Sequence, residues 1–288
     1  MPLHQKRSYA SKKTKRQALG QHFLRDTRVI GRILETVFEQ AKANQIVDFV
    51  EIGPGRGALT FPFTIELTSR MPGQVQSFKI FERDRELVDF WKSEQSPSIT
   101  GIFEGDFMDQ PQENFLLPDR PVGVFSNLPY SAGTAIFTRL ANHPDQIRFM
   151  VLMFQAEVAQ RIRAEVGTKA WGSLSLFSQN LWKVSKLISV APGAFVPPPE
   201  VQSEVILLEP RSEPLIPGTD PQKNPEGARL WEDLLRVAFQ HRRKMLRGGL
   251  PSTGPWKSAL EKSQVPGTKR AEALSWEEWK NWFDCLVS

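Results

Sequence analysis

The chain has 288 residues, 40% hydrophobic and 24% charged, which is enough for one large globular domain and a smaller one. No apolar run approaches the length that spans a bilayer, and the first residues lack the apolar stretch of a secretory signal. The single cysteine, Cys285, excludes an internal disulfide and fits a reducing compartment. We therefore expect a cytoplasmic protein without a membrane partner, although a basic start free of acids is also typical of a transit peptide.

Positive charge is concentrated in two places. The formal net charge of +5 favours a polyanionic partner only weakly. The first sixteen residues, however, contain six basic side chains and no acid, and a second cluster consists of Arg242, Arg243, Lys244 and Arg247. Either cluster alone is also explained as a solvated surface. Two clusters that flank a catalytic domain indicate nucleic-acid binding.

Apolar periodicity predicts an alternation of helices and strands through the first two thirds of the chain. Residues 26–43 form an amphipathic helix, with Asp26 as a plausible N-cap. The expected strands are residues 47–52, 78–82, 99–104, 122–126 and 149–154. The expected helices between them are residues 57–69, 84–94, 132–141 and 155–166. Such alternation predicts parallel strands joined by helical crossovers, hence a doubly wound α/β sheet.

The last third of the chain has a different pattern. Residues 181–190 and 201–208 are strand-like with no helix between them, which predicts an antiparallel pair at one edge of the sheet. A segment rich in Pro, Gly and charge follows, and the rest is helical, ending in a helix that opens with a capping box at Ser275 and Glu278. Five of the eight tryptophans lie after residue 230. We expect them to form an aromatic core, with base-stacking platforms as the alternative.

These boundaries predict four regions. Residues 1–16 form a basic tail, 17–210 a catalytic domain, 211–227 a linker, and 228–288 a helical domain that binds RNA or the ribosome.

A glycine-rich turn follows the first predicted strand. Gly53, Gly55 and Gly57 lie between that strand and a helix, and glycines there let the backbone turn sharply and approach a ligand closely. Dinucleotide enzymes use a similar turn, but their glycine spacing differs. Glu51 precedes the first glycine, and a carboxylate opposes a pyrophosphate but suits a cation. The motif therefore favours S-adenosylmethionine, which carries a sulfonium and an ammonium, over NAD.

Acidic residues end the next two predicted strands. Glu82 is placed to accept hydrogen bonds from ribose hydroxyls, the alternative being a charge at a helix N-terminus. Asp106 follows the third strand and is placed to accept the adenine amine of the cofactor, although alone it is equally typical of a turn.

The sequence Asn127-Leu128-Pro129-Tyr130 ends the fourth predicted strand, where ligands bind in open α/β sheets. An adenine N6 amine is a weak nucleophile because its lone pair is delocalised into the ring. The Asn127 side-chain oxygen and a main-chain carbonyl at Leu128 or Pro129 can accept its two N–H bonds and localise that lone pair. Tyr130 offers a ring face for a base that has left its stack.

Together these residues resemble the small-subunit ribosomal RNA adenine N6,N6-dimethyltransferase family. The resemblance covers nearly the whole chain. It begins at residues 20–24, includes the motifs at 51–55 and 127–130, and continues through residues 194–201, 239–247 and 269–274. One motif is weak evidence, whereas this series in this order is highly specific.

The resemblance implies a Rossmann-like class I methyltransferase sheet with a small C-terminal helical domain. It implies S-adenosylmethionine as cofactor and a monomer that acts on the pre-ribosomal small subunit in late assembly. The reaction is two methyl transfers to each of two adjacent adenosines near the 3′ end of small-subunit rRNA. The cofactor contacts carried over are His22, Leu24, Gly53, Glu82, Asp106 and Asn127, joined by Glu51 and Gly55 from the glycine-rich turn. No metal site is implied.

The resemblance also assigns Phe195 as the aromatic that stacks on the target adenine opposite Tyr130, with core packing as the alternative. The sequence departs from the family at Ser131, where asparagine is frequent, and at Ala156, where lysine is common.

Three other functions compete with this interpretation. A related family methylates large-subunit rRNA and gives macrolide resistance, but Leu128 and the second basic cluster argue against it. An assembly factor that has lost catalysis is disfavoured by the intact motifs at 53–57 and 127–130. An NAD-dependent dehydrogenase is more distant.

Overall fold

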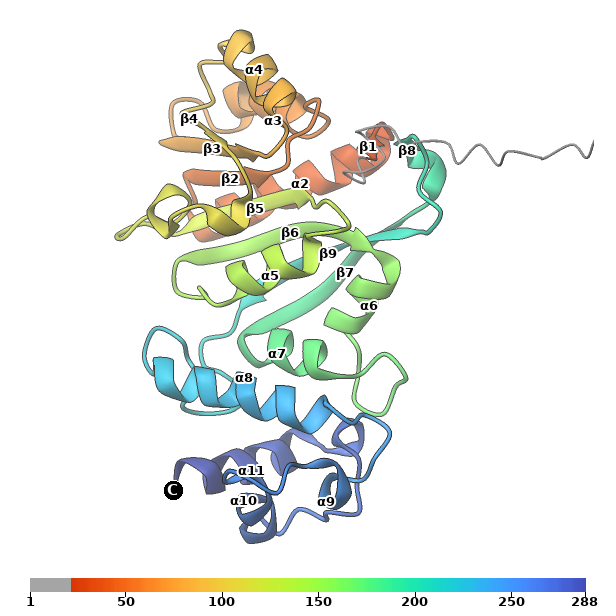
Figure 1. Cartoon of the computed structure of the whole chain (residues 1–288). Coiled ribbons are helices and arrows are strands. Elements are labelled where there is room, and N and C mark those ends of the chain that lie inside the picture. Colours follow the sequence, from red (N-terminus) through yellow and green to blue (C-terminus); the bar gives the residue numbers. More distant parts are fainter. Residues whose placement is uncertain (1–21) are drawn as a thin grey trace, which may run out of the picture.

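The computed structural model describes residues 22–288, so the basic tail lies outside the described part. Seven strands form one sheet in the order β4-β3-β2-β5-β6-β9-β7 (Figure 1). They are β2 (Asp48–Ile52), β3 (Ser77–Glu82), β4 (Gly101–Glu104), β5 (Val122–Asn127), β6 (Ile147–Gln155), β7 (Trp182–Val190) and β9 (Ser203–Pro210). The five predicted parallel strands are all present, with ends that differ by at most two residues from expectation. The expected α/β sheet is confirmed.

The chain builds this sheet outward from β2 in two directions. β3 and β4 add on one side, whereas β5 and β6 add on the other. Ligands of open α/β sheets bind at the carboxyl ends of the strands where the order reverses, which here is between β2 and β5. The predicted antiparallel pair is also confirmed, because β9 pairs with both β6 and β7, and β7 forms the edge.

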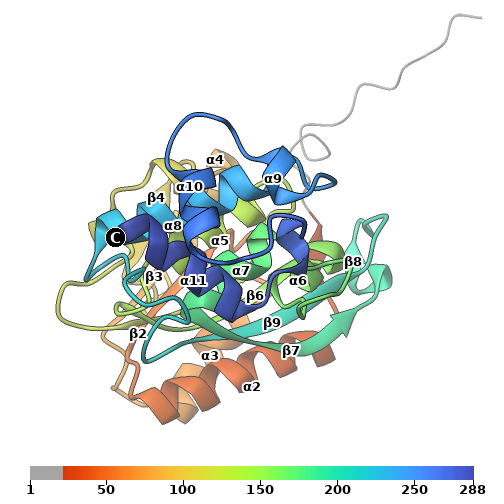
Figure 2. The same ribbon diagram turned by 90° about the horizontal axis from the view of Figure 1, so that it is seen from below.

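Helices cover both faces of the sheet. They are α2 (Thr27–Asn44), α3 (Thr60–Arg70), α4 (Arg85–Glu94), α5 (Gly133–Ala141), α6 (Ala156–Ile162) and α7 (Ser173–Leu181). Figure 2 shows α2 on one side of the sheet and α5, α6 and α7 on the other. Asp26 caps α2 by accepting from the backbone N–H of Arg28 and Val29, as expected.

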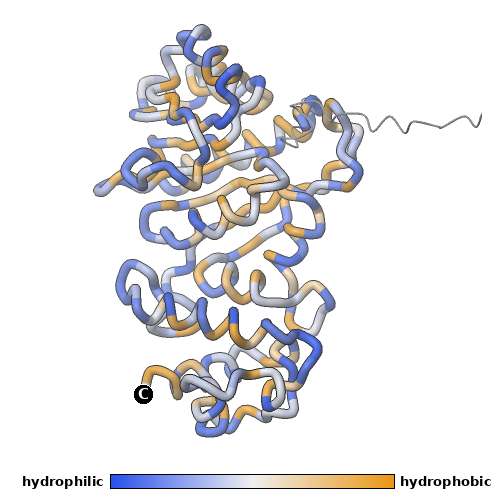
Figure 3. Tube along the Cα trace, in the orientation of Figure 1, coloured by the Kyte–Doolittle hydropathy of each residue, from blue (hydrophilic) through white to orange (hydrophobic). Residues whose placement is uncertain are grey.

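Two hydrophobic clusters hold these layers together. Successive strand residues point to opposite faces, so Phe49 of β2 packs in the cluster under α2 and α3, while Val50 packs under α5. Figure 3 shows the hydrophobic residues running along the inner strands and the hydrophilic ones gathering at the outer turns. Both faces of the central strands are therefore buried, as parallel sheets require.

Short elements were not expected from the sequence. Strands β1 (Phe23–Leu24) and β8 (Phe195–Val196) pair in a separate two-stranded antiparallel sheet. Helix α7 was also missed, because its serine-rich sequence has a weak helical pattern. Single turns of 3₁₀ helix occur at η1 (Phe107–Asp109), η2 (Gln112–Asn114), η3 (Pro192–Ala194) and η4 (Ala271–Ala273).

The C-terminal part is helical, as expected. It contains α8 (Pro225–Phe239), α9 (Leu246–Gly249), α10 (Trp256–Lys262) and α11 (Trp276–Val287). The capping box is present, with the Glu278 N–H donating to Ser275 Oγ and the Ser275 N–H donating to Glu278 Oε2. Trp279 and Trp282 are fully buried, so core packing, not base stacking, is their role. Within residues 22–288, no helix is both long and apolar enough to cross a membrane.

The third hydrophobic cluster joins this helical part to the rest. Trp171 and Leu176 pack in the same cluster as Trp231 and Trp279. Segment 211–227, predicted from composition as a linker, is an irregular connection whose middle is hydrogen-bonded to Asn180 of α7. Asn180 accepts from the Ile216 N–H through Oδ1 (2.8 Å), and its Nδ2 donates to Thr219 Oγ1 (2.8 Å).

Substitution Asn180→Ala tests this attachment. Removal of the amide leaves the buried Ile216 N–H without its acceptor, so we expect the free energy of unfolding to fall by about 1–3 kcal/mol. Urea unfolding measures the change. Asn44→Ala, at an exposed position of α2, is the matched control and should shift stability by less than about 0.5 kcal/mol. Equal effects in the two variants would mean that segment 211–227 is only loosely attached.

Candidate active site

The glycine-rich turn lies directly after β2. Gly53, Gly55 and Gly57 have φ values of +67°, +56° and +86°, in the left-handed region that favours glycine. A Cβ on Gly57 would lie 2.3 Å from the ring of Phe61, so only glycine fits there. The turn is held from outside by Trp91 of α4, whose Nε1 donates to the Gly55 carbonyl at 3.0 Å.

Glu82 ends β3 beside this turn and is almost completely buried. Its Oε1 accepts from the backbone N–H of Arg83 and Asp84, while Oε2 accepts from the Gly55 N–H at 3.2 Å. Burial raises the pKa of Glu82, and the backbone hydrogen bonds oppose that rise. Each carboxylate oxygen has two lone pairs, so Oε2 retains one for a ligand.

Glu51 points into the same region from β2 and is 2% exposed. Its Oε2 accepts from Thr60 Oγ1 at 2.8 Å. Burial raises the pKa of Glu51 to about 8, against the hydrogen bond from Thr60 and with a smaller contribution from the Glu82 charge. Glu51 is therefore largely protonated at neutral pH until a cation lies beside it.

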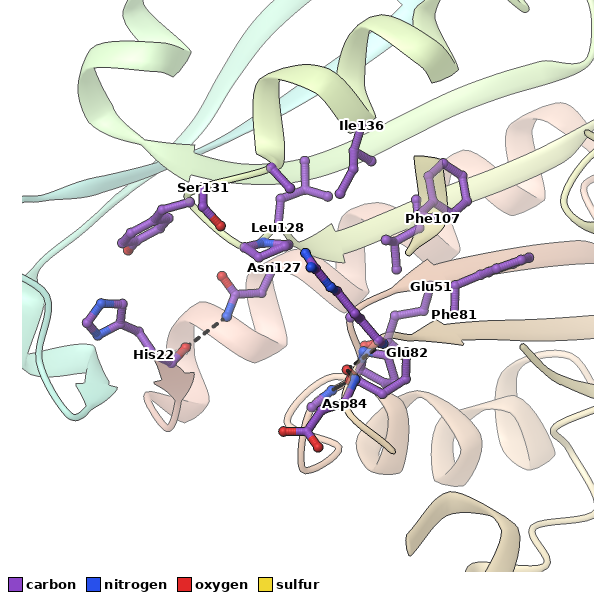
Figure 4. Close-up of a pocket in the computed structure, with 18 of the residues that line it drawn as sticks. His22, Glu51, Phe81, Glu82, Asp84, Phe107, Asn127, Leu128, Ser131 and Ile136 are labelled. Carbon is purple, nitrogen blue, oxygen red and sulfur yellow. Dashed lines mark hydrogen bonds between the residues drawn. The ribbon is translucent and has the colours of Figure 1, made fainter. Parts of the chain in front are cut away.

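Asn127 ends β5 with its side chain oriented by the β1 segment. Its Nδ2 donates to the carbonyl oxygen of His22 at 3.3 Å, drawn as a dashed line in Figure 4. Because a carbonyl only accepts, this bond leaves Asn127 Oδ1 as the free acceptor. The Pro129 carbonyl accepts from the N–H groups of Ala132 and Gly133, whereas the Leu128 carbonyl accepts from none of the described residues.

Tyr130 follows and is half-buried. Its Oη lies 2.5 Å from Ser203 Oγ, and its ring centroid lies 5.4 Å from that of His22, tilted by 31°. His22 is held in turn, because its Nδ1 lies 2.8 Å from the Pro197 carbonyl and therefore donates to it. The pairing of β1 with β8 thus brings residue 22 over the end of β5.

These groups line one cavity of about 250 Å³ at the reversal of strand order between β2 and β5. Eleven of the predicted site residues line it: His22, Leu24, Glu51, Gly53, Gly55, Glu82, Asp106, Asn127, Leu128, Pro129 and Tyr130. The lining includes four carboxylates and one guanidinium, that of Arg83, which pairs with Asp106 at 3.2 Å. The cavity is therefore suited to a cation and poorly suited to a pyrophosphate.

Phe195 is a correction to the sequence interpretation. It is 1% exposed, belongs to the hydrophobic cluster under α2, and does not line the cavity. β8 pairs Phe195 with Leu24, which turns its ring into the core. Core packing, the alternative reading, is what the structure shows for this residue.

The second basic cluster divides into two kinds of residue. Arg242 donates to the carbonyls of Lys169 and Trp171 and pairs with Glu272 at 2.7 Å, so it fastens two parts of the chain together. Arg243, Lys244 and Arg247 are exposed, and none forms an ion pair with another described residue. These three are therefore available to phosphates, whereas the half-exposed Arg242 side chain is partly engaged by Glu272.

Sequence reasoning missed the residues that hold the site from outside. Thr60, Trp91 and Ser203 each bond a site residue, yet none was given a role from the sequence.

Comparison with known proteins connects this site to a family. A model of the ribosomal RNA adenine dimethylase family matches residues 12–287. Ribosomal RNA small subunit methyltransferase A of Alcanivorax borkumensis is 36% identical over 256 residues, which cover 88% of this chain and 82% of the relative. The protein of the same name from Pseudomonas putida is 34% identical and covers 90% of both chains.

Two solved structures share the fold at 22% identity. A dimethyladenosine transferase from Plasmodium falciparum has a TM-score of 0.66 and covers 91% of this chain and 96% of its own. The 23S rRNA methyltransferase ErmE has a TM-score of 0.62 and covers 92% and 100%. These likenesses confirm the expected methyltransferase fold.

The burial of Glu51 predicts a pH dependence of stability. The carboxyl ionises near 4.5 in an ordinary environment and near 8 in the folded chain, so the folded state binds more protons between these values. Stability from Glu51 is therefore fully present below the lower pKa and lost as pH rises through the upper one. As the pH rises from about 5 to about 7, the wild-type protein should lose about 2 kcal/mol of unfolding free energy that the Glu51→Gln variant, which has no ionising group at this position, does not lose.

Denaturant unfolding at both pH values measures this difference. Glu39→Gln, at an exposed position of α2, is the control and should follow wild type throughout. A constant gap between Glu51→Gln and wild type would show that Glu51 is ionised in the free protein.

Proposed function

The chain belongs to the ribosomal RNA adenine dimethylase family of S-adenosylmethionine-dependent enzymes, and from this premise we propose its target. It dimethylates N6 of two adjacent adenosines near the 3′ end of small-subunit rRNA, during late ribosome assembly. The observation that carries the proposal is a pair of oxygens, Asn127 Oδ1 and the Leu128 carbonyl, that accept no hydrogen bond from residues 22–288 and lie at the end of β5 in a carboxylate-lined cavity.

The residues of the cavity fit the cofactor. The bare backbone of Gly53 and Gly55 allows close approach, and the remaining lone pair of Glu82 Oε2 can accept from a ribose hydroxyl. Glu51 lies where a cationic group would favour its ionised form, and Asp106 is the acceptor for the cofactor's adenine amine. His22 and Leu24 close the cavity from β1. S-adenosylmethionine, when bound, would supply a sulfonium methyl group that an amine can attack directly, with the neutral thioether as the leaving group.

The end of β5 supplies what the target amine needs. The two N–H bonds of N6 donate to Asn127 Oδ1 and to the Leu128 carbonyl, which localises the nitrogen lone pair. The Pro129 carbonyl, an equal candidate from sequence, already accepts two N–H bonds, so Leu128 is the second acceptor. The nitrogen becomes acidic once it carries the new methyl group, so no dedicated general base is needed.

Tyr130 supplies the face on which the extruded adenine stacks. Tyr130 is half-buried and lines the cavity. Phe195 could form the opposite face only if its ring left the core, so the proposal rests on Tyr130.

The small subunit is favoured over the alternatives. Relatives above 30% identity carry small-subunit names over more than four fifths of both chains, whereas the 23S rRNA enzyme matches in fold at 22% identity. The carboxylates of the cavity disfavour NAD. A non-catalytic assembly factor would not need the free acceptors at Asn127 and Leu128.

We further propose that the enzyme acts as a monomer in the cytoplasm, on the assembling small subunit. Exposed Arg243, Lys244 and Arg247 contact its phosphates, together with the basic tail, which lies outside the described residues.

Asn127→Ala tests both the substrate and the chemistry. The variant loses one acceptor for the charge that develops on N6, so single-turnover methylation should slow about ten- to a hundredfold at saturating cofactor. S-adenosylmethionine affinity should change much less. The substrates are purified small subunits that lack the modification, with large subunits in parallel, and dimethyladenosine is measured by mass spectrometry.

Asn44→Ala is the control for this experiment and should retain the wild-type rate. A near-normal rate for Asn127→Ala would make the motif structural. Wild-type methylation of large subunits alone would reject the proposed substrate.

Simultaneous replacement of Arg243, Lys244 and Arg247 by Ala tests the RNA surface. Affinity for the small subunit should fall, and the slope of log affinity against log salt should shrink by about 2–3, because each phosphate contact contributes somewhat less than one. A charge-matched control replaces Arg28, Arg32 and Lys42 of α2 by Ala. Figure 2 shows α2 and α9 on opposite sides of the molecule. Equal slopes in both triple variants would refute a specific contact.

A further inference from the structure

The hydroxyl of Tyr130 has one partner among the described residues, Ser203 Oγ at 2.5 Å. Ser203 is completely buried and likewise has no other side-chain partner in residues 22–288. The two residues lie 73 positions apart in sequence, so the fold itself brings them together. Loss of Tyr130 Oη would leave the buried Ser203 Oγ without a side-chain partner among the described residues, so this bond is a specific contact.

Ser203 is held rigidly on the side away from Tyr130. It is the first residue of β9 and lies opposite Gln155 of β6 and Val190 of β7, so the sheet fixes it from both edges. The next residue, Glu204, is 2% exposed and pairs with Arg163 at 2.5 Å and with Lys186 at 3.4 Å. This ion cluster clamps the start of β9.

Tyr130, by contrast, lies on an irregular connection between β5 and α5. Its side chain has two rotatable bonds, and only a fixed ring offers a defined stacking face. The hydroxyl lies at the far end of the side chain on the axis of ring rotation, so a bond there restricts rotation about the Cα–Cβ bond and fixes the position of the ring.

We propose that Ser203 is a positioning residue for the methyl transfer, which holds the Tyr130 ring at the place where it receives the target adenine. The inference rests on the proposed stacking role of Tyr130. Burial raises the pKa of Tyr130, so its hydroxyl stays protonated and able to bond Ser203 at physiological pH.

A double-mutant cycle of Ser203→Ala and Tyr130→Phe tests the coupling. Both variants keep the ring and lose the same hydrogen bond, from opposite sides. Each should slow single-turnover methylation about two- to tenfold, the value of one hydrogen bond. The double variant should be no slower than the slower single variant, because the bond can be lost only once. The affinity for S-adenosylmethionine should not change.

Ser178→Ala is the matched control. Ser178 of α7 is also fully buried, and its hydroxyl donates to main-chain carbonyls far from Tyr130, so its loss should lower stability without slowing methylation. Multiplicative effects in the cycle, or a full rate for Tyr130→Phe, overturn the proposal. The latter result decides the question even if Ser203→Ala fails to fold.

The cycle is run on whichever ribosomal subunit the wild-type enzyme methylates. Methylation of large subunits alone by the wild-type enzyme would contradict the proposed substrate. The coupling between Ser203 and Tyr130 would still be measured, because it is calculated from rate ratios of the variants on the same RNA.

Discussion

One hydrogen bond marks the place on which the site depends. β2 and β5 pair through Glu51 and Phe125, and there their main-chain pairing stops. One residue further along, Ser126 Oγ donates to the Ile52 carbonyl at 2.5 Å. This side-chain hydrogen bond stands where the next main-chain hydrogen bond between the two strands would be. β5 continues beside β6 for two more residues, up to Asn127 opposite Met153. The strands therefore separate while their ends stay tied, which opens the cavity between the glycine-rich turn and Asn127.

The cofactor half of the cavity was predictable because it is local in sequence. Glycines at positive φ and acids at strand ends follow short apolar runs, and parallel strands necessarily bring such ends to one edge. Glu51, Gly53, Glu82 and Asp106 were assigned from this rule together with the family resemblance, and all four line the cavity. This rule predicts that the side chains lie close together, but it does not predict whether a carboxyl group among them is protonated. Only the packing around Glu51 shows that burial raises its pKa to about 8.

The target half was less predictable because it is assembled from distant segments. His22 orients Asn127, and Ser203 holds Tyr130, across sequence separations of 105 and 73 residues. A sequence motif does not show which of its polar atoms are already hydrogen-bonded. The carbonyls of Leu128 and Pro129 were therefore equal candidates for the second acceptor until the turn at 129–133 was known. Phe195 was misjudged for the same reason, because an aromatic residue looks free in the sequence until its partners in the core are found.

The proposed reaction places opposite electrostatic demands on one small protein, because its cofactor is a cation and its substrate a polyanion. The two arginines beside the glycine-rich turn are compensated or stacked: Arg83 pairs with Asp106, and the Arg56 guanidinium lies 5.9 Å from the centroid of the Phe23 ring. The cavity thus keeps its carboxylate character, while exposed cations lie near α9. Methyl transfer removes the sulfonium charge, so the same carboxylates attract the spent cofactor less than the fresh one. An enzyme that must exchange its cofactor between successive methylations of one target gains from that difference, since it favours release of the product at every step.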